Sequence, residues 1–309
     1  MRLRLWIPLL LLAAFAYLSL SYVPQQVIFA ERSPITLSPQ AVGLAFEEVV
    51  ISPVDNALQL AGWWMPAEEA SAALVFVHGG GSNRQTAYFK ALEFYREMVA
   101  QGVSVLAIDL RNHGNSDADD RGLQFGLSES ADAIAAIEWV RGRGAQLPTF
   151  AMGISMGGAT LIHAVHRGAP VDGLILLDPL LDTRSAFTRG AAAATGLPPA
   201  LFGPAAWAAT EFYGLPEGDN AALNLALELT LPVLLMQDPD DPVTVAQYAH
   251  NLAEGNDNVT LWMAPPVDTR HPDLAWKAGW GSHVAAFHMF PEQAVDAIMQ
   301  FMGDAAAAP

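Results

Sequence analysis

A serine surrounded by glycines is the first feature of this sequence that could do covalent chemistry. Residues 153–157, Gly-Ile-Ser-Met-Gly, have the G-x-S-x-G pattern. In this pattern a serine stands on a sharp turn between a strand and a helix, with its hydroxyl projecting from the edge of a sheet. Small residues two positions before and after Ser155 avoid a collision across the turn. The pentapeptide by itself also fits plain glycine-rich packing, so its neighbours in the sequence must decide.

A second glycine run could supply backbone N–H groups to a reacting oxygen. The stretch VFVHGGGSNR (75–84) follows an apolar segment, as an oxyanion-binding loop does. We expect one N–H donor from Met156 and the other from Gly80 or Gly81. A glycine-rich loop can also bind phosphate, but the G-x-x-x-x-G-K-[ST] motif typical of that role does not follow here. His78 stands beside the strand and is predicted to be structural.

A serine nucleophile needs a base, and histidine is the usual one. His283, in GWGSHVAAF, lies between the last expected strand and the last expected helix. That is where the chain order Ser, Asp, His places the base. His288 is a weaker candidate, and His271 is weaker still.

The carboxylate that orients this histidine should follow a strand between the serine and the histidine. The stretch LPVLLMQDPDDPVTV supplies Asp238, Asp240 and Asp241 directly after an apolar run. A solvated turn with a helix cap would account for one or two of them. The residues alone therefore leave the choice open.

Strands must alternate with helices to position these groups, and the sequence shows that alternation. Apolar runs at 71–78, 103–110, 148–154, 171–179, 231–237 and 259–264 alternate with helical stretches near 86–101, 128–143, 156–167, 243–254 and 291–302. Residues 45–52 and 57–66 predict an antiparallel pair around a turn at Asp55-Asn56. The pattern predicts an α/β fold, with a mostly parallel sheet and helices on both faces.

The alternation of strands and helices is interrupted at residues 184–229, which are rich in Ala, Pro and Leu and show no strand pattern. This insertion is predicted to form a helical lid over the carboxyl edge of the sheet. Its aromatic residues are candidates for an acyl-binding pocket, with ordinary packing within the lid as the alternative. They include Phe187, Phe202, Trp207 and Phe212.

The N-terminus has the features of an export signal. Two arginines precede an apolar run that begins at Leu5, which fits a cleaved signal peptide or an uncleaved signal anchor. The length of the apolar stretch 5–23 favours an anchor for the N-terminal segment 1–23, with the rest of the chain outside the cytoplasm. Residues 24–44 are predicted to be an extended tether, 45–302 the folded domain and 303–309 a C-terminal tail.

Composition excludes several functions. The chain has 15 basic and 32 acidic residues and a formal net charge of −17, so a nucleic-acid partner is not expected. Without cysteine it has no disulfide, no thiolate nucleophile and no cysteine-bound metal. The acidity is best explained as an aid to solubility.

Taken together, these motifs resemble those of the α/β-hydrolase superfamily. The likeness is to its monoacylglycerol-lipase-like and serine-aminopeptidase-like branch, which has membrane-anchored bacterial members, and it covers about residues 45–302. The resemblance implies that IDLRNHGNSD is a structural loop in which His113 is not catalytic. It also implies that Asp241 is the catalytic acid. Asp238 stands where that family usually has glycine, which keeps Asp240 open as the alternative.

The expected activity is hydrolysis of carboxylic esters or thioesters through an acyl-enzyme on Ser155, with no metal or organic cofactor. Amide or peptide hydrolysis and acyl transfer are alternatives on the same three residues. A catalytically inactive exported binding protein is a further alternative of a different class.

Overall fold

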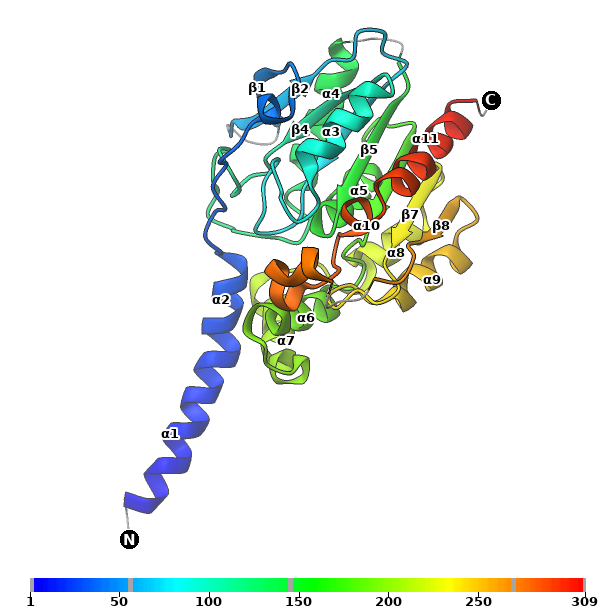
Figure 1. Ribbon diagram of the computed structural model, residues 1–309. Coiled ribbons are helices and arrows are strands. Elements are labelled where there is room, and N and C mark those ends of the chain that lie inside the picture. Colours follow the sequence, from blue (N-terminus) through cyan, green and yellow to red (C-terminus); the bar gives the residue numbers. More distant parts are fainter. Residues whose placement is uncertain (1–2, 55–57, 144–146, 268–270, 308–309) are drawn as a thin grey trace.

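A mixed eight-stranded sheet forms the centre of the protein. The computed structural model describes residues 3–54, 58–143, 147–267 and 271–307. The strands are β1 (Glu47–Ile51), β2 (Leu60–Met65), β3 (Ala72–Val77), β4 (Val103–Ile108), β5 (Thr149–Ile154), β6 (Gly173–Leu177), β7 (Val233–Gln237) and β8 (Val259–Met263). Their order in the sheet is β1-β2-β4-β3-β5-β6-β7-β8 (Figure 1).

The sheet is antiparallel at one edge and parallel elsewhere. β1 pairs with β2 and β2 with β4 in antiparallel fashion, and the other pairs are parallel. The expected opening antiparallel pair is thus confirmed, although its turn at Asp55-Asn56 lies outside the described residues. Strands β3 to β7 are buried along their whole length, as expected of strands covered on both faces.

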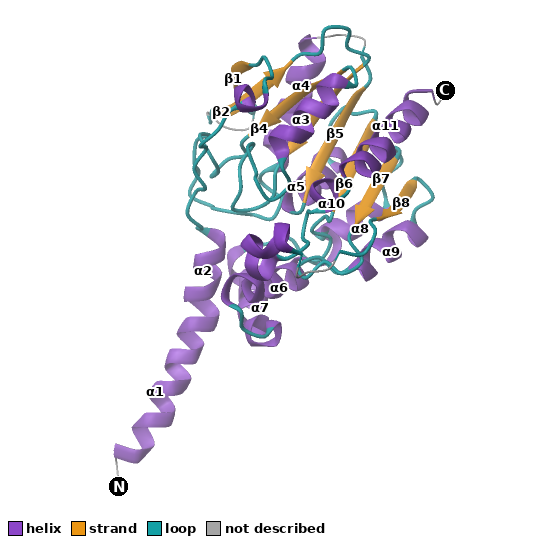
Figure 2. Ribbon diagram, in the orientation of Figure 1, coloured by secondary structure: helices purple, strands orange, loops and turns teal. Residues whose placement is uncertain are grey.

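Helices cover both faces of the sheet (Figure 2). The main helices of the domain are α3 (Ala91–Ala100), α4 (Ser130–Arg143), α5 (Met156–His166), α9 (Ala246–Gly255), α10 (Ala286–Met289) and α11 (Pro291–Ala307). Helices α4, α5 and α9 share one apolar core with the sheet, and α3 and α11 share a second core on its other side. Helix α11 continues to Ala307 instead of ending near residue 302, so most of the expected C-terminal tail is helical.

The insertion between β6 and β7 is helical, as expected. It contains α6 (Thr183–Thr195), α7 (Gly203–Tyr213) and α8 (Ala222–Leu227), with short 3-10 turns η3 (Pro199–Phe202) and η4 (Gly218–Asn220). We refer to residues 184–229 as the lid insertion. A further 3-10 segment, η5 (Pro272–Trp280), leads into the turn that carries His283.

The N-terminal helix extends beyond its expected end. α1 (Leu3–Tyr17), a π-helical turn η1 (Leu18–Tyr22) and α2 (Val23–Ile28) form one helical run that projects from the domain (Figure 1). Within it, Trp6–Ile28 is long and apolar enough to cross a membrane. The prediction of an extended tether from residue 24 is therefore wrong for its first residues, because Pro24 occupies the first turn of α2, where proline is tolerated.

Candidate active site

Ser155 lies on a strained turn between β5 and α5. Its φ of 52° and ψ of −120° are unusual for a residue with a side chain. A Cβ atom on Gly157 would collide with the carbonyl oxygens of Val77 and His78, and one on Gly158 would lie 2.7 Å from Pro179 Cβ. The glycines therefore let α5 start close to the sheet. This position leaves the Ser155 side chain partly exposed to solvent.

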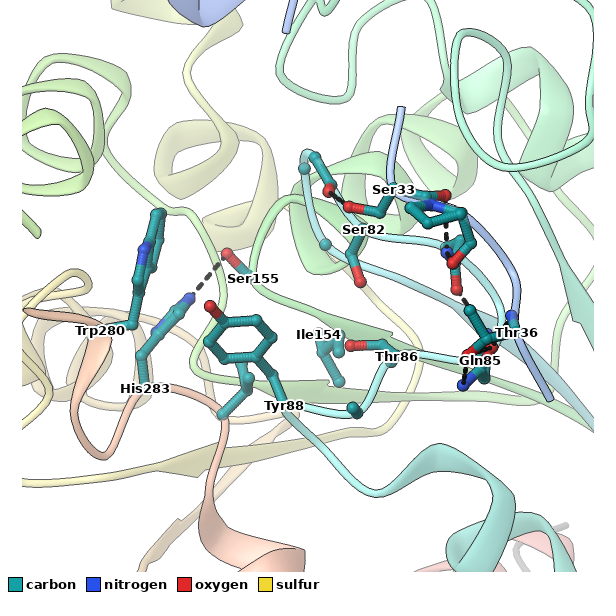
Figure 3. A pocket seen from close by; sticks show the side chains of 17 residues that line it. Ser33, Thr36, Ser82, Gln85, Thr86, Tyr88, Ile154, Ser155, Trp280 and His283 are labelled. Atoms are coloured by element: carbon teal, nitrogen blue, oxygen red, sulfur yellow. Dashed lines mark hydrogen bonds between the residues drawn. The ribbon is translucent and has the colours of Figure 1, made fainter. Parts of the chain in front are cut away.

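A chain of hydrogen bonds joins Ser155 to a histidine and a carboxylate. His283 Nδ1 donates to Asp241 Oδ2 at 2.7 Å, and His283 Nε2 accepts from Ser155 Oγ at 3.0 Å (Figure 3). The carboxylate fixes the tautomer that leaves Nε2 free to accept a proton. This is the arrangement of nucleophile, base and orienting acid found in serine hydrolases.

Asp241 is held as a buried anion. Its Oδ1 accepts hydrogen bonds from the backbone amides of Val243 and Thr244, and its Oδ2 accepts from the Thr244 hydroxyl. Burial favours the neutral carboxyl, but the neighbouring His283 and these donors outweigh it and lower the pKa of Asp241. Asp240, the alternative acid, is exposed, and no hydrogen bond to His283 is found for it in the described part of the chain.

The glycine run after β3 faces the serine. A Cβ on Gly79 would lie 3.2 Å from Ser155 Cβ, and one on Gly80 would lie 3.3 Å from Met156 Sδ. The Gly81 amide instead donates to His113 Nε2 at 3.1 Å, which occupies it. Of the two glycines expected to supply a donor, the geometry leaves Gly80, opposite the first residue of α5. The amides of a helix's first turn lack partners within the helix.

Comparison with known proteins identifies the fold around this site. The family model described as "Serine aminopeptidase, S33" matches residues 68–209. A solved structure of an esterase from Pyrococcus furiosus superimposes with a TM-score of 0.69 at 21% identity, covering 89% of this chain and 97% of that one. The protein has the α/β-hydrolase fold. The structure of Est1E from Butyrivibrio proteoclasticus with bound ferulic acid has the same fold, with a TM-score of 0.59 at 16% identity over 84% of this chain and all of that one.

Curated relatives match a shorter region of the chain. The lysophosphatidylserine lipases ABHD12 of Macaca fascicularis and Mus musculus are each 26% identical over 129 residues. These alignments cover 40% of this chain and 30% of each relative. The chain thus aligns with less than a third of the length of these lipases.

His78 and His113 hold the loops beside the candidate site. His78 Nδ1 donates to the Gly79 carbonyl and its Nε2 accepts from the Leu110 amide. His113 Nδ1 donates to the Arg111 carbonyl, while its Nε2 accepts from Gly81. Burial lowers the pKa of His78 to about 4 and that of His113 to about 3, so both are neutral at pH 7. Each ring fixes backbone groups around the glycine run.

The other histidine candidates do not reach Ser155. His271 accepts a hydrogen bond from the Asp273 amide at the start of η5. His288 lies on α10 beside a different cavity, which Lys90 and Glu292 also line. Neither residue lines the cavity beside Ser155.

Two buried residues near His283 were not anticipated from the sequence. Asp178, at the end of β6, accepts hydrogen bonds from the amides of Asp238 and Val284, the residue after His283. Burial and the nearby Asp241 raise the pKa of Asp178 well above its usual range. Lys277 Nζ donates to the His283 carbonyl at 3.0 Å, and burial lowers the pKa of Lys277 to about 8.

Asp178 is also part of the one metal-compatible cluster found among the described residues. Ligand-type atoms of Asp178, Asp241 and His283 lie within 4.8 Å of one another. The carboxylate oxygens of both aspartates already accept hydrogen bonds from protein groups. Protein hydrogen bonds therefore already occupy these potential metal ligands, and the bonds join three loops.

A cavity of about 440 Å³ opens beside Ser155, and its walls differ from expectation. The aromatic residues proposed as an acyl pocket do not line it. Phe187 is buried against Phe125, and Phe202 is also buried in the lid insertion. Trp207 and Phe212 pack on each other at 5.2 Å and remain 42% and 63% exposed. The acyl pocket built from these side chains stays a prediction, since none of the four lines the cavity beside Ser155 and α7 packs against the N-terminal helix.

Proposed function

We propose that this protein is a serine hydrolase that cleaves carboxylic esters or thioesters. The observation that carries the proposal is the hydrogen-bond chain from Ser155 through His283 to Asp241, at the end of a cavity large enough for a small ester. The esterase and the lipases to which the chain is similar support an ester substrate.

The geometry supports acyl transfer in two steps. His283 Nε2 removes the proton from Ser155 Oγ as the oxygen attacks the ester carbonyl, and Asp241 stabilises the imidazolium that forms. The amides of Gly80 and Met156 would stabilise the negative oxygen, and each such donor typically lowers the barrier by about 3 kcal/mol. His283 then passes its proton to the leaving alcohol. Water, activated by the same histidine, hydrolyses the acyl-enzyme.

Covalent labelling with a fluorophosphonate probe tests the nucleophile. The full chain in detergent micelles should be labelled at Ser155, and Ser155→Ala should not be labelled. Hydrolysis of p-nitrophenyl esters by the full chain should disappear in the same variant. Labelling together with turnover of amides but not of esters would redirect the proposal to an amidase. The absence of labelling would favour an inactive binding protein.

We further propose that the hydrolase domain is anchored to a membrane and lies outside the cytoplasm. The apolar helix Trp6–Ile28 is the support for the anchor, and the two arginines before it favour a cytoplasmic N-terminus. A reporter that is active only outside the cytoplasm, fused to the C-terminus, should be active. Recovery of the intact chain in the soluble cytoplasmic fraction would refute this placement.

A further inference from the structure

The residues just after the N-terminal helix reach the cavity beside Ser155. We call residues 29–38 the juxtamembrane segment. Ser33, Pro34 and Thr36 from this segment line the same cavity as Ser155 and His283. Figure 3 shows His283 and Ser155 at one end and Ser33 and Thr36 at the other. A segment expected to be a passive tether therefore forms part of the candidate active site.

The segment is bonded directly to the glycine run. Ser33 Oγ donates to the Gly81 carbonyl at 2.7 Å, and Asn83 Nδ2 donates to the carbonyls of Ser33 and Pro34. Gly81 has a φ of +66°, and its amide is fixed by His113 on another side. The loop that contains Gly80 is thus held both by the domain and by the juxtamembrane segment.

A second set of bonds fixes the far end of the wall. Gln85 Oε1 accepts from the backbone amides of Thr36 and Leu37 at 2.7 and 3.0 Å. Gln85 Nε2 donates to Thr36 Oγ1 at 3.2 Å. These contacts hold the extended backbone against the domain, so this part of the wall is formed before any substrate binds.

The chemistry of this wall is polar and uncharged. No Lys, Arg, Asp or Glu occurs among the described residues that line the cavity. The hydroxyl groups of Ser82 and Thr86 face the cavity in Figure 3, and neither has a hydrogen bond to another described residue. They are available to a hydroxyl or carbonyl group of a ligand. A carboxylate or phosphate there would lose water without gaining a cationic partner.

We infer that Ser33, Pro34 and Thr36 of the juxtamembrane segment form a specificity-determining wall of the substrate cavity, and that this wall accepts an uncharged, hydrogen-bonding part of an ester. This inference rests on the proposed esterase function. It assigns a binding role to residues that connect the membrane helix to the domain. Substrate choice then depends on the docking of the segment, because the glycine run and Gln85 hold its backbone.

A large side chain introduced at this wall should reduce the size of the cavity without changing its other walls. Thr36 is exposed and lines the cavity, whereas Leu37 is 53% exposed and does not line it. Thr36→Trp and Leu37→Trp therefore form a matched pair on neighbouring residues. The substrates are p-nitrophenyl acetate, 2-hydroxyethyl butanoate and the anionic carboxymethyl butanoate, tested with the full chain in detergent micelles.

We expect the unmodified protein to prefer the hydroxyethyl ester to its anionic counterpart by about tenfold in kcat/KM. Thr36→Trp should lower kcat/KM for the hydroxyethyl ester by about tenfold and change that for p-nitrophenyl acetate less than about twofold. Leu37→Trp should change neither. Equal effects of the two tryptophans, or a preference for the anionic ester, would overturn the inference. Absence of turnover of every ester by the unmodified protein would instead overturn the proposed function, and the inference with it.

A second matched pair tests the support given to the glycine run. Ser33→Ala removes the bond to the Gly81 carbonyl, whereas Ser38→Ala removes a hydroxyl with no such bond. We expect Ser33→Ala to lower kcat several-fold for all three esters with little change in KM, because the Gly80 amide loses its fixed position. If Ser33→Ala behaves like Ser38→Ala, the wall does not support the glycine run.

Discussion

The juxtamembrane segment and the lid insertion differ in whether they line the cavity beside Ser155, and the difference is the opposite of what their sequences suggest. Residues 29–38, which look like a linker, line the cavity beside Ser155 and bind the glycine run. The lid insertion, which looks like a cover for an acyl pocket, contacts the loops behind the catalytic candidates. Arg189 Nη1 donates to the Pro242 carbonyl, and a Cβ on Gly279 would collide with the Ala193 backbone.

Each segment thus supports a different part of the site. The juxtamembrane segment holds the loop with the proposed oxyanion donor, and the lid insertion packs on η5, which leads to His283. The exposed aromatic pair Trp207 and Phe212 lies on α7, which packs against the N-terminal helix. Apolar composition therefore indicated burial or an interface, but it did not indicate which surface is contacted.

The largest effect should come from Ser155 and His283, which lie at one end of the cavity (Figure 3). Ser155→Ala and His283→Ala should each lower kcat by about a thousandfold or more, and the double variant should be little worse, because the residues act as a unit. His288→Ala is the control and should retain most activity. Steady-state hydrolysis of p-nitrophenyl acetate measures all four. A large loss in His288→Ala with little loss in His283→Ala would move the base elsewhere.

A somewhat smaller loss should follow removal of the acid, whose loop the lid insertion touches at Pro242. Asp241→Asn should lower kcat at least a hundredfold, because the amide cannot stabilise the imidazolium and favours the wrong tautomer. Asp240→Asn should have little effect, since Asp240 is exposed. The same kinetic assay compares the two, and a greater loss at Asp240 would contradict the assignment.

Contact between the lid insertion and η5 can be disturbed with one methyl group. Gly279→Ala should displace α6 or η5. The overpacking should lower the free energy of unfolding by about 1–3 kcal/mol, and with it the melting temperature, and the displacement should lower kcat. Gly203→Ala, in the same lid insertion, adds a methyl group with nothing within 4 Å and is the control. Thermal unfolding and ester kinetics report on both. Unchanged kinetics in a destabilised Gly279→Ala would mean that the lid insertion supports folding only.

The smallest effect on substrate choice is expected from Trp207→Ala. Trp207 is 42% exposed and packs on Phe212 instead of lining the cavity. The ratio of kcat/KM for p-nitrophenyl octanoate to that for the acetate should change less than about twofold, as for a typical surface substitution. A change as large as that expected for Thr36→Trp would show that the lid insertion reaches the substrate after all.

Much of the site could be predicted because its signals are local. Ser155 and its glycines are adjacent in sequence, and the turn between strand and helix imposes their spacing. His283 was predicted from the strand and helix that flank it, whereas the strand pattern left three aspartates open and only the family resemblance pointed to Asp241. Asp178 also follows a strand, β6, but a single aspartate there gave no signal of its contact with the loops of Asp238 and His283.

The sequence by itself determined the α/β fold, the strand order along the chain, the serine turn and the apolar N-terminal helix, because periodicity and close packing act over a few residues. Only the tertiary structure showed that the Gly81 amide is occupied by His113, which leaves Gly80 as the proposed donor. It also decided which segment lines the cavity. Ser33 meets Gly81, and α7 meets the N-terminal helix, through contacts between residues far apart in the chain. Such contacts depend on how whole elements pack, which no local pattern records.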